Sequence, residues 1–121
     1  MNIVMLGYRG TGKSVISKLL SKKLRMKLYK IDQMISESVE KSIPEMVEQE
    51  GWENFRKLES EIVAEVCDKA KNSIIDCGGG VVLNDSNIVN LKKGGVCIVL
   101  TASLETIIKR ILQDKNRPSL E

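Results

Sequence analysis

Histidine is absent from the 121-residue sequence, and cysteine occurs only three times. Without histidine, a zinc site would have to be built from closely spaced thiolates, and Cys67, Cys77 and Cys97 stand far apart in the chain. Their odd number and apolar surroundings indicate reduced core residues of a cytoplasmic protein.

Aromatic residues are few, and long apolar runs and basic blocks are absent. Four aromatic side chains cannot form a platform for stacked bases, and the net charge of +3 contains no basic block, so we expect no nucleic-acid partner. No apolar stretch approaches membrane-spanning length, and the N-terminal run is too short for a signal peptide, so we expect no membrane partner. The apolar content of 42% and charged content of 29% are ordinary for a soluble chain, and the length predicts one domain, residues 1–121.

A phosphate-binding loop is the clearest feature that the sequence does contain. Residues 7–14 read Gly-Tyr-Arg-Gly-Thr-Gly-Lys-Ser, which matches the pattern G-x-x-x-x-G-K-[ST]. An apolar run precedes the loop and a helical pattern follows it, so backbone N–H groups and the helix dipole would face a polyphosphate. A chance glycine-rich turn is the alternative.

Individual residues of this loop have expected roles. The Lys13 ammonium would reach the β- and γ-phosphates and act in catalysis, and the Ser14 hydroxyl would ligate Mg²⁺. The residues that we predict to bind the nucleotide here are Gly10, Thr11, Gly12, Lys13, Ser14 and Val15.

Strand and helix patterns alternate along the chain. Apolar strand patterns lie at about 2–6, 27–31, 73–76 and 96–100, and the last is unbroken, as expected of a strand buried on both faces. Helical patterns lie at about 13–24 and 85–92, and after Ser103, which would cap a helix. The alternation predicts an α/β fold, a parallel sheet with flanking helices and right-handed crossovers.

Residues 32–72 are more than one crossover helix requires, and we interpret them as a helical insertion that binds the phosphate acceptor. Ser42-Ile43-Pro44-Glu45 is a capping box with proline in the first turn. A longer helix is expected from about Trp52 to Ala70. Its apolar stripe is Phe55, Leu58, Ile62, Val63, Val66 and Ala70.

Two carboxylates follow predicted strands and should face the same sheet edge as the phosphate loop. Asp32 follows the second strand and Asp76 ends the third. One could hold Mg²⁺, and the other could accept a proton from the attacking hydroxyl. The structural alternatives are a helix N-cap for Asp32 and a turn residue for Asp76.

Glycines and arginines complete the candidate site. Gly78, Gly79 and Gly80 suggest a backbone that a ligand approaches closely, with a plain turn as the alternative. Arg56 could clamp an anionic substrate with Glu59 orienting it, although a surface ion pair is the simpler interpretation.

Two further arginines lie near the C-terminus. Arg110 is in the last helical pattern and Arg117 in the loop beyond it. A mobile loop can carry an arginine over a phosphate site, whereas a solvated charge is the alternative for each residue.

The ordered set of motifs resembles the shikimate kinase family over essentially the whole chain. Besides the loop at 7–14, it includes Asp32, Ser-Ile-Pro-Glu at 42–45, Phe55-Arg56-x-x-Glu59, Gly78–Gly80 and Arg117-Pro118-x-Leu120. The resemblance implies a P-loop kinase fold of the nucleoside monophosphate kinase type, strand order 2-3-1-4-5, with four of the five strands present. It also implies ATP-dependent phosphorylation of the 3-hydroxyl of shikimate, in aromatic amino acid biosynthesis.

Residue roles follow from the same resemblance. Asp32 would bind the acceptor hydroxyls and act as the base, Arg56 would hold the shikimate carboxylate, and Gly78–Gly80 would line the pocket. Arg110 would pack on adenine, and Arg117 would contact the phosphates from a lid that begins at residues 113–121. The full-length protein is expected to be a monomer.

The sequence departs from the family pattern at two points. Lys30 replaces the first acid of a D-x-D pair that is associated with magnesium, and Asp76 stands where many members carry a small hydroxyl residue, so we assign Ser14 and Asp76 to Mg²⁺. The chain also stops at Glu121, inside the expected lid. We therefore expect weak turnover, lowered stability, self-association and an exposed edge at 96–100.

Two other functions stay open from the sequence. A kinase for another small hydroxy acid such as gluconate would need a different acceptor region. An inactive nucleotide-binding module is the other, favoured by Lys30 and the early stop.

Overall fold

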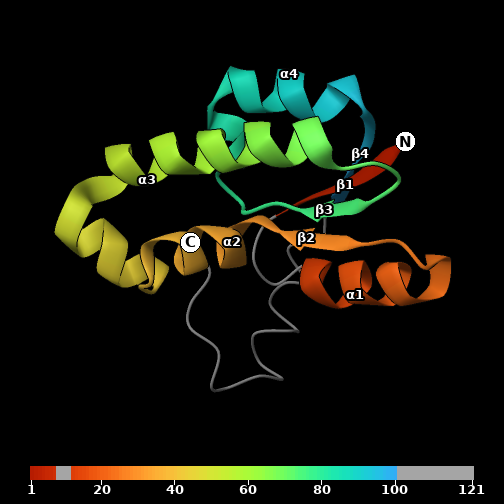
Figure 1. The fold of residues 1–121 in the computed structure, drawn as a ribbon, viewed down its shortest axis with the longest axis horizontal. Helices are drawn as coiled ribbons and strands as arrows, with labels where there is room; N and C mark the ends of the chain where they lie inside the picture. Colours follow the sequence, from red (N-terminus) through yellow and green to blue (C-terminus); the bar gives the residue numbers. More distant parts are fainter. Residues whose placement is uncertain (8–11, 101–121) are drawn as a thin grey trace, which may run out of the picture.

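The computed structural model describes residues 1–7 and 12–100 (Figure 1). The strands in these ranges are β1 (Asn2–Gly7), β2 (Leu28–Lys30), β3 (Ile74–Asp76) and β4 (Gly95–Leu100). The α-helices are α1 (Lys13–Leu24), α2 (Ile31–Val39), α3 (Ile43–Lys69) and α4 (Asp85–Lys93), and a short 3₁₀ turn covers Val81–Leu83.

The described strands form one parallel sheet in the order β2-β3-β1-β4. Ile3 of β1 is in register with Ile74 of β3 on one side and with Val96 of β4 on the other. All strands therefore end at the same edge of the sheet, where the connections after β1, β2 and β3 meet. This confirms the first four positions of the expected strand order.

Helices cover the sheet from two sides (Figure 1). α3 and α4 lie over one face, and α1 lies on the other, in contact with β1, β2 and β3. Successive strand residues point to opposite faces of the sheet. Val4 and Ile75 point to the face that α3 covers, where they belong to one core cluster with Phe55, Val63 and other α3 side chains.

The insertion between β2 and β3 contains α2 as well as the expected helices. α2 begins at Ile31, directly after β2, so the expected strand at 27–31 is too long at its end. α3 is interrupted at Gly51, whose φ of 85° and ψ of 165° are not helical. This break separates the expected capping-box helix from the expected helix at 52–70, and glycine suits its positive φ.

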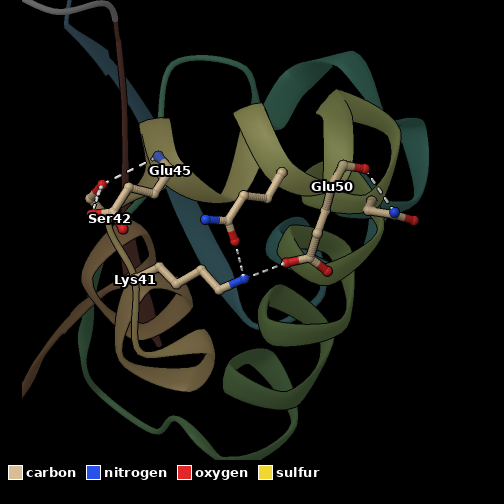
Figure 2. Close-up of polar contacts among 6 residues, drawn as sticks. Lys41, Ser42, Glu45 and Glu50 are labelled. Atoms are coloured by element: carbon tan, nitrogen blue, oxygen red, sulfur yellow. Dashed lines mark hydrogen bonds and ion pairs between the residues drawn. The ribbon is translucent and has the colours of Figure 1, made fainter.

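Polar side chains hold the start of α3 and its break (Figure 2). The Ser42 hydroxyl accepts a hydrogen bond of 3.3 Å from the backbone N–H of Glu45 and donates one of 3.0 Å to the Glu45 carboxylate. These bonds confirm the helix cap expected at Ser42. Lys41 donates to Gln49 at 2.7 Å, and its ammonium lies 3.4 Å from the Glu50 carboxylate. On the far side of Gly51, the Asn54 amide donates to the Glu50 carbonyl at 2.8 Å.

β4 lies at the edge of the described sheet. Val96, Ile98 and Val99 are 48%, 38% and 60% exposed, so the expectation of burial on both faces is wrong for this chain. The expectation of an exposed apolar edge at 96–100 is confirmed. The expected helix after Ser103, Arg110, Arg117 and the lid segment 113–121 all lie outside the described residues.

The cysteines agree with the expectation of reduced residues near the core. Cys77 is buried, Cys67 and Cys97 are half-buried against the core cluster, and all three are free thiols. Burial raises the pKa of Cys77 and of Cys67, so both thiols stay protonated near neutral pH. Within the described part of the chain, no helix has the length and apolar character to cross a membrane.

Candidate active site

The phosphate-binding loop ends at a helix start that is open to an anion. Gly12 is the N-cap of α1 and has a left-handed backbone, φ 80° and ψ 14°, and the first turn of α1 carries no acidic residue. The N-terminal partial charge of the helix is therefore not compensated by its own side chains. Ser14 and Val15 are exposed in this turn, whereas Gly10 and Thr11 lie outside the described residues.

Lys13 links the helix start to the end of β3. Its ammonium lies 3.4 Å from Oδ1 of Asp76 and donates to the backbone carbonyl of Cys77. Asp76 is the last residue of β3 and only 7% exposed, so the interpretation as a turn residue is wrong. The Lys13 ammonium thus contacts a carboxylate and a backbone carbonyl, and a bound phosphate would have to replace these contacts.

Asp32 stands beside this pair at the end of β2. It lies in the first turn of α2, where Lys30 is the N-cap, so the N-cap interpretation of Asp32 is wrong. The residue as a whole is exposed, but surrounding protein atoms desolvate its carboxylate and raise the pKa of that group. Lys13 and Arg56 act in the opposite direction, and Asp76 adds to the increase.

Arg56 approaches from α3 and is paired with a buried acid. Its Nη1 donates to Oε1 of Glu59 at 2.9 Å, and Glu59 is 1% exposed, so the pair is not the surface ion pair considered above. The guanidinium carbon lies 5.2 Å from the Trp52 ring centroid and 5.0 Å from that of Phe55. The pKa of Glu59 is raised because burial desolvates its carboxylate, and the hydrogen bond from Arg56 offsets only part of this increase.

The glycines after β3 lie against both of these candidate side chains. A Cβ on Gly78 would sit 2.6 Å from Oδ1 of Asp32, and a Cβ on Gly80 would overlap the Arg56 guanidinium. Only glycine allows these two side chains to pack so closely on the backbone, while Gly79 is exposed between them. The structure therefore brings Asp32 and Arg56 to one short segment, Gly78–Gly80, which is the convergence that the resemblance implies.

The burial of Glu59 is a feature of the site that was not predicted from the sequence. Glu59 is four residues after Phe55 and three before Ile62, so it occupies a position on the apolar stripe of α3. An acid at such a position is a detectable signal for a buried partner cation. Its second oxygen, Oε2, has no hydrogen-bond partner among the residues that the structure describes.

Comparison with known proteins identifies the family. A family model described as shikimate kinase matches residues 9–121. The chain belongs to the shikimate kinase family. The shikimate kinase of Caldanaerobacter subterraneus is 42% identical over 119 residues, which cover 98% of this chain and 69% of that protein. The shikimate kinase of Thermodesulfovibrio yellowstonii is 40% identical over 120 residues, with 99% and 69% covered.

Solved shikimate kinases share the fold. The enzyme from Acinetobacter baumannii, in complex with shikimate, is 29% identical with a TM-score of 0.84, covering 97% of this chain and 65% of that one. The enzyme from Aquifex aeolicus is 31% identical with a TM-score of 0.84, covering 98% and 70%. The P-loop kinase fold is thereby confirmed, and the chain spans about two thirds of the length of these shikimate kinases.

Proposed function

We propose that this chain carries the donor and acceptor sites of an enzyme that transfers the γ-phosphoryl group of ATP to the 3-hydroxyl of shikimate. The observation that supports this most directly is the convergence of Lys13, Asp32 and Arg56 at one edge of the sheet, around Asp76 and Gly78–Gly80. A phosphate-binding lysine, a carboxylate and an arginine are the groups that phosphorylation of a hydroxy acid needs.

The donor side would be held by the loop and the start of α1. Lys13 would leave Asp76 and the Cys77 carbonyl for the terminal phosphates, and the helix dipole would favour their charge. Ser14 and Asp76 offer the hydroxyl and carboxylate oxygens that Mg²⁺ binds together with phosphates, so the residues present fit this ion. Mg²⁺ would neutralise charge on the transferred group. Within the described ranges no cluster of three or more potential metal ligands forms, so the phosphates and water would complete the coordination.

The acceptor side would be held by Asp32 and Arg56. The hydroxyl oxygen attacks the γ-phosphorus, the bond to the β-phosphate oxygen breaks, and the Asp32 carboxylate takes the hydroxyl proton. The raised pKa of Asp32 makes it a better proton acceptor than an ordinary aspartate. Arg56, held by Glu59, would pair with the substrate carboxylate in a bidentate manner.

The cellular setting belongs to the same proposal. We place the reaction in aromatic amino acid biosynthesis in the cytoplasm, with a monomeric full-length enzyme. Arg110 and Arg117 would contact adenine and the phosphates.

The decisive experiment is a phosphotransfer assay with Mg-ATP against shikimate, gluconate and nucleoside monophosphates, using this chain and a version extended at its C-terminus to the length of its relatives. We expect transfer to shikimate alone, strongest in the extended chain. Asp32→Asn should reduce kcat, whereas Arg56→Ala should chiefly raise the KM for shikimate. Transfer to gluconate would contradict the assignment of shikimate as the acceptor. An equal rise in KM for an acceptor without a carboxylate in Arg56→Ala would contradict the assignment of Arg56 to the substrate carboxylate.

A nucleotide-binding module without turnover is the second candidate. The exposed apolar residues of β4 and the Lys13–Asp76 pair favour it, because neither arrangement suits a closed catalytic site. It predicts ATP binding by this chain with no transfer to any of the three acceptors.

A further inference from the structure

Lys30 places a second cation at the sheet edge that holds the phosphate-binding loop. It ends β2 and is in register with Asp76 at the end of β3. Neighbouring parallel strands lie about 4.8 Å apart, and residues in register point to the same face. The preceding residue, Tyr29, packs into the core cluster with α3, so Lys30 points to the opposite face, the one that α1 covers.

This position is within reach of the groups that Lys13 contacts. Asp76 stands between the two lysines, 3.4 Å from the Lys13 ammonium and one strand from the Lys30 backbone. A lysine ammonium stands about 6 Å from its own Cα on a flexible stem, so the Lys30 ammonium can reach an anion that displaces Lys13 from Asp76.

The charges on this face favour an additional anion. Lys13 and Lys30 stand near two acids, Asp76 and Asp32, and the α1 N-terminus adds positive partial charge without an acid in its first turn. Within the described ranges no ion pair engages Lys30, which is half-buried. A polyphosphate on the loop would bring its negative charge to the α1 N-terminus and within reach of both lysines.

We propose that Lys30 is a second cationic ligand for the phosphates of the bound nucleotide, and that it lets this chain bind ATP without Mg²⁺. The inference rests on the proposed function, since it needs a nucleotide at the loop. It predicts that nucleotide binding by this chain does not require Mg²⁺.

The test is calorimetric titration of ATP into the 121-residue chain, in excess Mg²⁺ and in excess EDTA. Lys30→Met keeps the apolar stem and removes the charge, and Lys30→Asp reverses it. Lys27→Met is the matched control, because it makes the same charge change beyond the opposite end of β2. Denaturant unfolding of each variant checks folding, and Lys30→Gln replaces Lys30→Met if the latter does not fold.

We expect the unaltered chain to keep measurable affinity in EDTA and Lys30→Met to lose roughly tenfold or more there, since a charge-assisted contact disappears. In Mg²⁺ the loss should be smaller, Lys30→Asp should bind only with Mg²⁺, and Lys27→Met should match the unaltered chain. Binding by the unaltered chain with no effect of Lys30→Met overturns this inference alone. Failure of the unaltered chain to bind ATP in either condition overturns both the inference and the proposed nucleotide site.

Discussion

Replacing Gly80 with alanine tests whether the segment that follows β3 fixes the position of Arg56. The Gly80 backbone has φ −92° and ψ 3°, which alanine adopts without strain. A Cβ there would overlap the Arg56 guanidinium, whose Nη1 donates to Glu59 at 2.9 Å. The guanidinium must therefore move, and the almost fully buried Glu59 carboxylate loses its cation.

The size of the effect follows from the burial of this pair. Removing one partner of a fully buried ion pair costs about 3–5 kcal/mol of unfolding free energy. The Arg56 side chain is 30% exposed, and its flexible stem allows a partial adjustment, so the full penalty does not apply. We expect Gly80→Ala to reduce the free energy of unfolding by about 1–3 kcal/mol, and to weaken binding of a carboxylate substrate about tenfold in the extended enzyme.

Denaturant unfolding and a double-mutant cycle measure this prediction. Gly94→Ala is the control, since its backbone also has negative φ and its Cβ would stay 3.9 Å from Asn2 Nδ2. In a Glu59→Gln background the effect of Gly80→Ala should shrink, because the buried charge is gone. A Gly80→Ala chain as stable as Gly94→Ala, or an unchanged effect in the Glu59→Gln background, would refute the reasoning.

Three other predictions concern charge and the sheet edge. Lys13→Ala should weaken ATP binding roughly tenfold or more, because a charged contact to the phosphates is lost, and unchanged calorimetric affinity would contradict this. The same change should reduce the free energy of unfolding by about 1–3 kcal/mol, because Asp76 is left buried without its cation. Burial raises the pKa of Asp32 above its ordinary value of 3.8 and that of Glu59 above 4.5, so the folded chain holds a proton on each carboxyl group more tightly than the unfolded chain. The free energy of unfolding should therefore fall as pH rises from below these ordinary pKa values through the raised pKa values of the folded chain. Asp32→Asn and Glu59→Gln should each flatten this slope in denaturant titrations, and slopes equal to that of the unaltered chain would count against it. Val99→Lys should reduce self-association in sedimentation velocity, because a charge on an edge strand opposes pairing, and a monomeric unaltered chain would show the premise to be wrong.

Local chemistry made some elements predictable from the sequence. The bounds of α1 followed from the loop motif, which places the helix start at Lys13, and from apolar spacing up to Leu24. The cap at Ser42 followed from its hydroxyl and the glutamate three residues later. The glycines at 78–80 indicated a close approach, although the pattern could not say that Asp32 and Arg56 are the approaching groups.

Other features depend on contacts that no local pattern contains. α2 has nine residues and begins directly after β2 without a side-chain cap, so strand and helix patterns merge at Ile31. The run at 96–100 predicts a strand, but its exposure depends on what lies beside it in the sheet. The pairing of Lys13 with Asp76 joins residues 63 positions apart, and it follows only from the parallel register of β1 and β3.

The middle position of β3 explains how one short segment can serve both halves of the site. β3 lies between β2 and β1, so its carboxyl end faces the acceptor helices on one side and the phosphate-binding helix on the other. Asp76 contacts Lys13 of the proposed donor side, and Gly78 and Gly80 lie against Asp32 and Arg56 of the proposed acceptor side. Phosphoryl transfer depends on the distance between the two substrates, because a small misplacement sharply lowers the rate. If the proposed roles hold, the backbone from Asp76 to Gly80 would set that distance, because it contacts Lys13 through Asp76 and leaves room for Asp32 and Arg56 at Gly78 and Gly80.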